Sequence, residues 1–504
     1  MFNKIKNLKE LKTILKKKKF VLAHGVFDIF HIGHKRHLEN AKSYADFLVV
    51  SITTDKFVKK GPNRPIFNSI QRAELIASLE TVDYVYINND ETPIHLIKEI
   101  KPNFYIKGND YSNLKKDLTG NIYKEKKATE NGGGKLIISN DIEFSSSNLI
   151  NNYFKPTLIL SEIKKNEKNL NLFRNECIKN IEKIKDLKIA VLGEIIFDEY
   201  LISEEMGKPS KENIFAVEFK TKKTYLGGSF AIAKQLSKLS KNVTLFTSGR
   251  FNSEQSKLLN DKLNTSKNLK VKRIKSDFKN IIKSRYITSE NKKLFEVYKR
   301  EGNSDYFDPK NLIRDLKMSI KNYDLVLISD FGHGFFSKEL YNIILKNSKY
   351  LCINTQTNAG NRGYNLITKY KKANMVALDE PEIRLALKNK TDPIKKVTQD
   401  LFKIMKVEKI VVTLGKKGIL VFSKNSKNKI KFFKLSAFET NPIDTIGAGD
   451  AVFGIASALS VCKSEIKIIS FISNLLGAMT TNIVGHEKSI EKNEILKALN
   501  YSLK

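Results

Sequence analysis

One short stretch, Asp444-Thr445-Ile446-Gly447-Ala448-Gly449-Asp450, constrains the fold of this chain more than any other. The apolar residues 451–459 that follow it predict a helix, so two glycines and a carboxylate lie at a helix start. Backbone N–H groups at a helix start are free to bind an anion, and glycine lets a phosphate come close to the backbone. The predicted contacts to a nucleotide phosphate are Gly447, Ala448 and Gly449. We expect Asp450 to remove a proton from an attacking hydroxyl; the alternative is a glycine-rich turn without a ligand.

Length and composition limit the class of protein. A chain of 504 residues suggests two or three domains. The net charge of +35 would suit nucleic acid, but the lysines are spread over the whole chain, so we expect no specific nucleic-acid partner. Three distant cysteines give neither a disulfide framework nor a metal-ligand spacing. Because no apolar run is long enough to span a bilayer and no signal-peptide core is present, we expect a cytoplasmic protein without a membrane partner.

Strand-like and helix-like segments alternate along the first part of the chain. The expected strands are 20–23, 47–53, 82–87, 104–107 and 135–139, and the expected helices between them include 69–78 and 93–100. This alternation predicts a doubly wound α/β fold, a parallel sheet that binds ligands at the carboxyl ends of its strands. The expected domains are a nucleotide-handling domain at 1–155, a helical connector at 156–186 and a second strand-first domain at 187–504.

Two histidines mark the first strand-to-helix turn. His31 and His34 are three residues apart with Gly33 between them, so both rings can face one point at the helix start. Paired imidazoles there suit stabilisation of charge on a phosphorus atom during in-line displacement. Zinc binding is the rival reading, but no third or fourth ligand lies at a suitable spacing. Structural histidines are the other alternative.

The first domain resembles the cytidylyltransferase-type nucleotidyltransferases. The resemblance begins at Gly25-Val26-Phe27-Asp28 and the histidine pair, and continues through Arg64-Pro65, Gln71-Arg72, the loop 107–111 and the serines 145–147. It implies a set of nucleotide contacts at Gly25, Phe27, Arg72, Lys107, Ser145, Ser146 and Ser147. It also implies a substrate contact at Asp110. The family has Thr-Asn directly before the first glycine, where this chain has Ala23-His24.

The second domain resembles the ribokinase-family carbohydrate kinases. The resemblance rests on the stretch 444–450, on the opening strand 187–193 and on Asp198 after it. It implies a small β-lid built from 198–203, 214–220 and 224–225. It further implies that Asp198, Gly227 and Gly228 bind a sugar.

The same resemblance implies where nucleotide and metal bind. Glu382 would hold waters on Mg²⁺. Thr413, Gly415 and Gly418 would contact nucleotide phosphates, with a plain hairpin turn as the open alternative for the two glycines. This chain departs from the family pattern at three positions, with Ala231 for Asn, His333 for Lys and Asp379 for Asn.

The pairing of the two domains resembles the bifunctional heptose-phosphate kinase/ADP-heptose adenylyltransferases of lipopolysaccharide precursor synthesis, in reversed order. The resemblance implies that the second domain phosphorylates a sugar phosphate at C1 with Mg²⁺ and ATP. The first domain would then transfer a nucleotidyl group from ATP, or from CTP, to a sugar 1-phosphate. A homodimer formed through the lid is also expected by resemblance. Two alternatives stay open: a polyol-phosphate cytidylyltransferase joined to a separate sugar kinase, and a lapsed kinase that only binds nucleotide.

Overall fold

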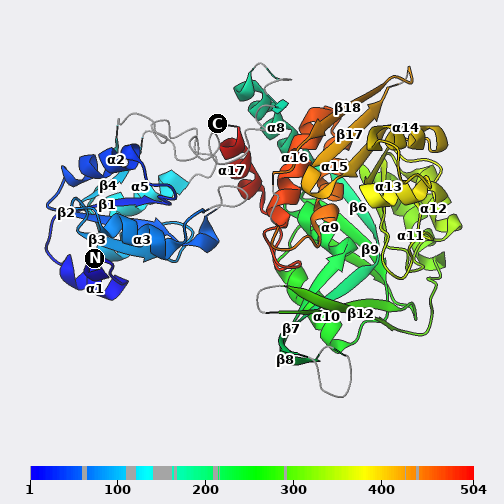
Figure 1. Ribbon diagram of the computed structural model, residues 1–504, viewed down its shortest axis with the longest axis horizontal. Coiled ribbons are helices and arrows are strands. Elements are labelled where there is room, and N and C mark those ends of the chain that lie inside the picture. The colour runs from blue at the N-terminus through cyan, green and yellow to red at the C-terminus, as the bar shows by residue number, and fades with distance from the viewer. Residues whose placement is uncertain are drawn as a thin grey trace. The chain divides into compact units, whose positions relative to one another are not determined.

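The computed structural model describes most of the chain. The described residues are 2–58, 65–108, 121–139, 162–163, 167, 169–207, 214, 216–288, 292–425, 427–438 and 442–503. They fall into two compact units, residues 1–161 with 496–504 and residues 162–495 (Figure 1). The domain boundaries expected from the sequence, at 155 and 186, stay predictions.

The first unit is built on a five-stranded parallel sheet in the order β3-β2-β1-β4-β5. Its strands are β1 (Phe20–Gly25), β2 (Phe47–Thr53), β3 (Tyr84–Asn88), β4 (Phe104–Lys107) and β5 (Lys135–Ile138). Its helices are η1 (Phe2–Lys4), α1 (Leu8–Ile14), α2 (Ile32–Lys42), η2 (Asp55–Phe57), α3 (Ser69–Ala77), α4 (Ile94–Ile100) and α5 (Asn121–Asn131).

Side chains of β1 pack alternately on the two faces of this sheet, and helices cover both faces. Val21 and Ala23 belong to a core shared with α2 and α3, whereas Phe20 and Leu22 belong to a core shared with α1, α4 and α5. Side chains of successive strand residues point to opposite faces, so a strand that is apolar throughout needs cover on both sides. The doubly wound fold expected for this region is therefore confirmed.

The second unit contains a nine-stranded sheet in the order β10-β9-β6-β13-β14-β15-β16-β17-β18. Its strands are β6 (Lys188–Gly193), β9 (Asn242–Ser248), β10 (Leu269–Ile274), β13 (Leu325–Asp330), β14 (Leu351–Thr355), β15 (Met375–Asp379), β16 (Lys409–Thr413), β17 (Ile419–Lys424) and β18 (Ile430–Leu435). All neighbours from β10 to β16 are parallel, and β17 and β18 extend the sheet in antiparallel fashion.

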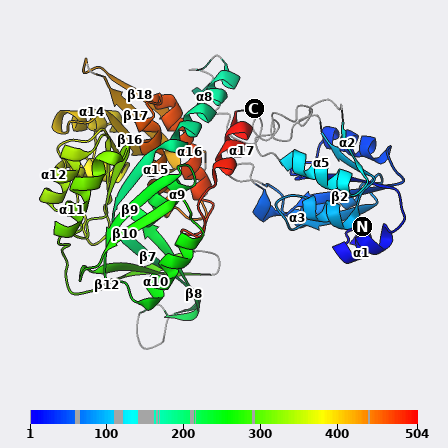
Figure 2. The ribbon, with the colours of Figure 1, turned by 180° about the vertical axis from the view of Figure 1, so that it is seen from behind.

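Helices cover both faces of this larger sheet. They are α8 (Leu170–Lys183), α9 (Ser229–Ser237), α10 (Ser253–Asn264), α11 (Lys310–Ser319), α12 (Lys338–Asn347), α13 (Glu380–Ala386), α14 (Ile394–Ile404), α15 (Ala448–Val461) and α16 (Ile466–Thr480). Short 3₁₀ turns lie at Ile184–Asp186, Ile320–Asn322, Ile367–Lys369 and Gly415–Lys417, and the last helix is α17 (Lys492–Ser502). Helices α11 to α14 gather on one side, as the two views show (Figures 1 and 2). On the other side α15 packs against α9 and α16 and is buried from Ala451 to Ser460.

A separate four-stranded sheet has the order β12-β11-β7-β8. Its strands are β7 (Ile195–Gly207), β8 (Ala216–Gly228), β11 (Asn280–Ile287) and β12 (Lys293–Glu301). Strands β7 and β8 form a long antiparallel pair that includes the expected lid segments 198–203 and 224–225, and residues 216–220 of the expected segment 214–220. We call this sheet the lid sheet. Among the described residues, no helix is both long enough and apolar enough to cross a bilayer.

Two candidate active sites

The histidine pair lies at the start of α2 in the first unit. His31 is the residue that caps this helix, because its Nδ1 accepts a hydrogen bond of 3.1 Å from the N–H of Gly33. The rings of His31 and His34 stack with their centroids 4.0 Å apart. Burial lowers the pKa of His31, which favours a neutral imidazole. Within the described part of the chain, His31 Nε2 is buried without a hydrogen-bond partner.

Aromatic rings position the second histidine. The ring of His34 lies 5.3 Å from Phe27 and 5.7 Å from Phe30, measured between centroids. Phe27 has a φ of 50°, a left-handed conformation that is uncommon for a bulky residue. Its ring also packs against Gly25, where an added Cβ would come within 3.1 Å of it. The structure therefore brings Gly25, Phe27 and the two histidines together, as expected.

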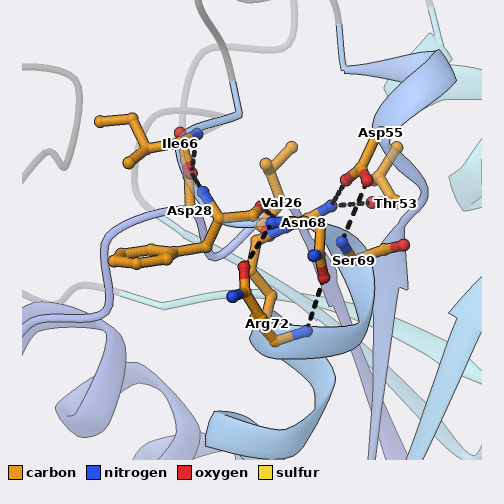
Figure 3. Close-up of polar contacts among 10 residues, drawn as sticks. Val26, Asp28, Thr53, Asp55, Ile66, Asn68, Ser69 and Arg72 are labelled. Carbon is orange, nitrogen blue, oxygen red and sulfur yellow. Dashed lines mark hydrogen bonds and ion pairs between the residues drawn. The ribbon is translucent and has the colours of Figure 1, made fainter. Parts of the chain in front are cut away.

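Arg72 on α3 forms hydrogen bonds to several separate segments of the first unit (Figure 3). Its buried guanidinium donates to the backbone carbonyls of Val26, Thr53 and Phe67, and to the carboxylate of Asp55 at 2.6 Å. Figure 3 also shows Asp28, whose Oδ1 accepts from the N–H of Ile66 at 2.6 Å. The predicted contact between Arg72 and a triphosphate stays a prediction, and the four hydrogen bonds of Arg72 are the role that the geometry gives the residue.

Lys107 lies at the carboxyl end of β4 and is also internally paired. Its Nζ is 3.3 Å from Oε2 of Glu125, and that carboxylate accepts a hydrogen bond of 2.8 Å from Tyr105. His24, which replaces the family's Asn, lies 3.1 Å from Ser51 Oγ, and burial followed by the charge of Lys107 lowers its pKa well below the usual value. The remaining expected residues of this site, Arg64, Asp110, Ser145, Ser146 and Ser147, lie outside the described residues.

The second candidate site begins where α15 starts. Gly447 precedes the helix with a φ of 78°, a left-handed conformation that glycine tolerates best. Among the described residues no side chain caps the helix. The N–H of Ala448 donates a hydrogen bond of 3.4 Å to the carbonyl oxygen of Thr445, and the N–H groups that follow it in the first turn stay available to an anion. An added Cβ at Gly449 would meet nothing within 4 Å, so the helix start is open on that side. These features are the ones that a phosphate site at Gly447, Ala448 and Gly449 requires.

Asp450 lies in the first turn of the same helix. Burial raises its pKa to about 7, with a further contribution from the negative charge of Asp198 and an opposing one from Lys283. A carboxylate with a pKa near the working pH is suited to act as a general base, because it is ionised yet still basic enough to accept a proton. Lys283 itself is buried on β11 and faces Asp198, Arg285, Glu296 and Asp450.

Asp198 is held by residues that the sequence analysis did not identify. Oδ1 accepts a hydrogen bond of 2.5 Å from Arg285 on β11, and Oδ2 lies 3.6 Å from Nε2 of His486. The ring of His486 packs over Gly447, where an added Cβ would lie 2.3 Å from it. An added Cβ at Gly227 would lie 1.9 Å from Asp198 Oδ2, which explains the glycine there. The chain thus brings Asp198, Gly227, Gly447 and Asp450 together around His486.

Gly228 serves a different purpose from Gly227. Its φ of 61° and the nearby carbonyl oxygen of Glu194, 2.8 Å from an added Cβ, require glycine at the turn between β8 and α9. The expected sugar contact at this residue stays a prediction. The neighbouring Glu194 is buried next to Asp330, and burial raises its pKa to about 8.

Glu382 forms a reciprocal cap with Asp379 at the start of α13. Its Oε1 and Oε2 accept backbone hydrogen bonds of 2.9 Å from Thr357 and Asp379 respectively. Burial, followed by the charge of Asp379, raises the pKa of Glu382 to about 8. In the part of the chain that is described, no group of three or more His, Cys, Asp or Glu side chains could hold a metal ion. A contact from this carboxylate to Mg²⁺ through intervening water, a common arrangement for this ion, stays a prediction.

The turn after β16 lies at the same sheet edge as Asp379. Thr413 is the register partner of Asp379, so the two residues are adjacent where their strands end. Gly415 has a φ of 56° with open space around its Cα, whereas an added Cβ at Gly418 would lie 2.0 Å from the carbonyl oxygen of Leu435. Packing therefore accounts for Gly418 as a hairpin glycine, and the expected phosphate contacts at this turn stay predictions.

Comparisons with known proteins match both units. Residues 22–152 match the family described as cytidylyltransferase-like, and residues 186–485 match the pfkB family of carbohydrate kinases. The first domain is 46% identical over 123 residues to the bifunctional protein HldE of Aliarcobacter butzleri (strain RM4018), a match that covers 23% of this chain and 25% of that protein. HldE of Geobacter metallireducens is 41% identical over 116 residues, covering 22% of this chain and 24% of the relative. The chain spans about a quarter of the length of the curated relatives that it matches.

Solved structures align with the other part of the chain. Phosphofructokinase-2 of Escherichia coli, in a complex with potassium, aligns with a TM-score of 0.49 and 14% identity over 63% of this chain and 100% of its own. Ribokinase of Thermotoga maritima aligns with a TM-score of 0.48 and 16% identity over 62% of this chain and 99% of its own.

Proposed function

Because the chain belongs to the pfkB family of carbohydrate kinases, we propose that its second domain phosphorylates a sugar phosphate at the C1 hydroxyl with ATP. The observation that carries this proposal is Asp450, a half-buried carboxylate with a pKa raised to about 7, in the first turn of an uncapped helix. Asp450 takes the proton of the C1 hydroxyl, whose oxygen attacks the γ-phosphorus while ADP leaves. The N–H groups after Gly447 stabilise the charge on the transferring group.

Asp198, Gly227 and Gly228 are the proposed acceptor contacts. Asp198 is buried and already oriented by Arg285, so a sugar hydroxyl that donates to it meets an acceptor fixed in position. The absence of a side chain at Gly227 keeps the space beside Asp198 clear. Arg285 also pairs with Glu296 of β12 at 2.6 Å, so Asp198, Arg285 and Glu296 form a chain of contacts across three strands of the lid sheet.

Mg²⁺ and ATP are the proposed partners of this reaction. Mg²⁺ supplies charge neutralisation between the nucleotide phosphates when it is bound. Glu382 would hold water molecules of the ion, since each of its oxygens accepts one backbone hydrogen bond and retains a lone pair. Thr413, Gly415 and Gly418 are the proposed contacts on the nucleotide side.

For the first domain we propose transfer of a nucleotidyl group to a sugar 1-phosphate. The sugar-phosphate oxygen attacks the α-phosphorus of ATP, or of CTP, and pyrophosphate leaves. Two stacked imidazoles at the start of α2 support this, because both can stabilise charge that develops on a phosphorus atom at the positive end of the helix dipole. The HldE relatives are named as bifunctional proteins, and we propose that this chain likewise couples both steps to make an ADP-heptose-like product.

One experiment tests both steps. The full chain is incubated with Mg²⁺, with ATP or CTP, and with a panel of sugar and polyol phosphates, and the products are identified by mass. A sugar bisphosphate together with ADP supports the kinase, and a nucleotide sugar together with pyrophosphate supports the transferase. Nucleotide binding without turnover would contradict the kinase assignment, and a cytidylylated polyol would contradict the sugar assignment.

We also propose a cytoplasmic homodimer that forms through the lid sheet. The lid sheet exposes large apolar side chains, among them Phe219 on β8 and Phe295 and Val297 on β12. Apolar strands that face water are candidates for burial in an interface. Light scattering of the full chain should give twice the monomer mass, and a monomeric mass would contradict the proposal.

A further inference from the structure

A hollow lies beside the proposed base, Asp450. It is lined by one face of α9, by the start of α15 and by the segment 485–490. The residues that matter for the argument are Ala231, Lys234, Asp450, His486 and Lys488. We call this feature the α9 hollow. It runs from the proposed reacting centre along the helix that follows Gly228.

Lys234 is the unusual residue of the α9 hollow. It is half-buried, and within the described residues its ammonium forms no ion pair or hydrogen bond. Other lysines nearby have carboxylate partners: Lys238 lies 2.7 Å from Glu491, and Lys488 lies 3.8 Å from Glu494. An enclosed charge without a partner is costly in free energy, and a bound anion removes that cost. The α9 hollow therefore suits a ligand that carries negative charge.

The lowered pKa of Lys234 is consistent with an anionic ligand in the α9 hollow. Burial, and then the positive charges of Lys262 and Lys238, lower its pKa to about 8, while Glu491 opposes them. A phosphate beside the ammonium would reverse this shift and favour the charged form. Lys488, which pairs loosely with Glu494, is a second cationic residue in the lining of the α9 hollow.

The path between Lys234 and Asp450 is open because of Ala231. Residues three apart lie on the same helical face, so Ala231 and Lys234 line one wall of the α9 hollow. Ala231 contributes only a methyl group to the wall between Asp450 and Lys234. His486 contributes a ring that stays neutral, because burial lowers its pKa. An acceptor with its reacting hydroxyl at Asp450 thus extends along a polar, uncharged stretch toward Lys234.

We propose that Lys234 is a specificity-determining residue that binds the phosphate group already carried by the sugar acceptor, with Lys488 at the rim. This inference rests on the proposed kinase function, since Asp450 fixes the position of the acceptor. The γ-phosphate of ATP has the same chemistry, but we assign it to the open start of α15 next to Gly449. A change at Lys234 distinguishes the two phosphates, because it should affect the KM for the sugar acceptor and not the KM for ATP.

The test uses the full chain with three variants. Lys234→Met removes the charge, Lys234→Arg retains it, and Lys241→Met is the matched control, because Lys241 is exposed and pairs with Asp186 at 3.5 Å. ADP release is measured with a heptose phosphate and with the same heptose without its phosphate. We expect Lys234→Met to raise the KM for the heptose phosphate about ten- to a hundredfold. The KM for ATP and the rate with the unphosphorylated heptose should stay as in Lys241→Met, and Lys234→Arg should recover most of the affinity.

The inference is overturned if Lys234→Met and Lys241→Met have the same KM for the heptose phosphate, or if only the KM for ATP rises. If the unaltered chain releases no ADP with any acceptor, the proposed kinase function fails, and calorimetric titration of the heptose phosphate still tests the site. Binding that is lost in Lys234→Met but retained in Lys241→Met supports the inference. Equal binding by the two variants, or no binding by the unaltered chain, contradicts it.

Discussion

The ammonium of Lys293 on lid strand β12 lies 3.0 Å from the carboxylate of Asp444 in the loop that leads into α15. The same carboxylate accepts 2.7 Å and 2.9 Å hydrogen bonds from Tyr200 of β7 and from the N–H of Gly485. Burial alone would raise the pKa of Asp444, but these three donors outweigh it and keep the pKa below its usual value. One buried carboxylate therefore joins two lid strands to the proposed phosphate-binding helix.

The lid attachment can be tested through Tyr200. We expect Tyr200→Phe to lower the free energy of unfolding of the second domain by about 1–3 kcal/mol, because a buried carboxylate oxygen loses one of its two donors. Lys293→Met should change it by less than about 1 kcal/mol, since Lys293 is partly exposed to solvent. Urea unfolding of both variants measures the difference. A larger loss in Lys293→Met than in Tyr200→Phe would contradict this ranking.

Replacement of the proposed base should abolish turnover but leave substrates bound. Asp450→Asn keeps the shape of the side chain and removes its basicity, so sugar-dependent ADP release should fall about a hundredfold or more. Asp261→Asn on α10 is a control with the same chemical change. If Asp450→Asn retains more than a few per cent of the activity, the base lies elsewhere.

The kinase rate should depend on pH through Asp450. Its pKa is raised to about 7, so the reactive carboxylate form is lost as the pH falls below that value. We expect kcat/KM to rise with pH below about 7 and to level off above it. The charged or titratable groups that face Asp450 include Asp198, Lys283 and Glu382, and Glu382 has its own raised pKa of about 8.

The pH profile of Glu382→Gln separates these groups. A break near pH 7 that persists in this variant belongs to Asp450, whereas a break that disappears belongs to Glu382. A flat profile down to pH 5 in the unaltered chain would contradict the raised pKa of Asp450.

Arg72 should matter for the stability of the first domain. Arg72→Met removes the donor to three backbone carbonyls and the ion pair with Asp55, so we expect a loss of about 3–5 kcal/mol in the free energy of unfolding. Arg36→Met, at an exposed position of α2, should lose less than about 0.5 kcal/mol. Thermal unfolding of both variants decides the point, and equal melting temperatures would count against a structural role for Arg72.

The histidine pair should carry the nucleotidyl transfer. We expect the double change His31→Ala and His34→Ala to reduce pyrophosphate release about a hundredfold or more, because two donors to the developing charge are lost. The ADP release of the second domain should be unaffected, which provides an internal control. Undiminished pyrophosphate release would remove the transferase assignment.

The predictions from sequence succeeded where apolar runs or special turn residues set the structure. The strands of the first domain lie within two residues of the predicted segments, because each contains a short run of apolar residues. Strand β12 was not predicted, since almost all of its residues are exposed and many are charged. Strand β12 forms because it pairs with β11, and its own sequence does not predict a strand.

The site residues that were not predicted from the sequence reach the site through contacts between segments far apart in the chain. Arg285 and His486 surround Asp198 only after β11 and the segment behind α16 have folded next to β7. Neither residue lies in a motif of its own, so the sequence contains no local signal for them. The fold class and the transferase families of both domains, by contrast, were predicted from short motifs and are confirmed by the family matches.

One residue, Glu194, separates β6 from β7, which extends from Ile195 to Gly207 with two register shifts in its pairing with β8, between Ile202 and Ser203 and between Glu205 and Gly207. Asp198 lies near the start of β7, and the tip of the lid lies near the end of β7, so both belong to the same strand. The β7–β8 pair leaves the body of the domain at Glu194 and at the left-handed turn of Gly228. A movement of the lid sheet as one body would carry Asp198 away from Asp450, so the proposed acceptor site would come apart as the lid opened.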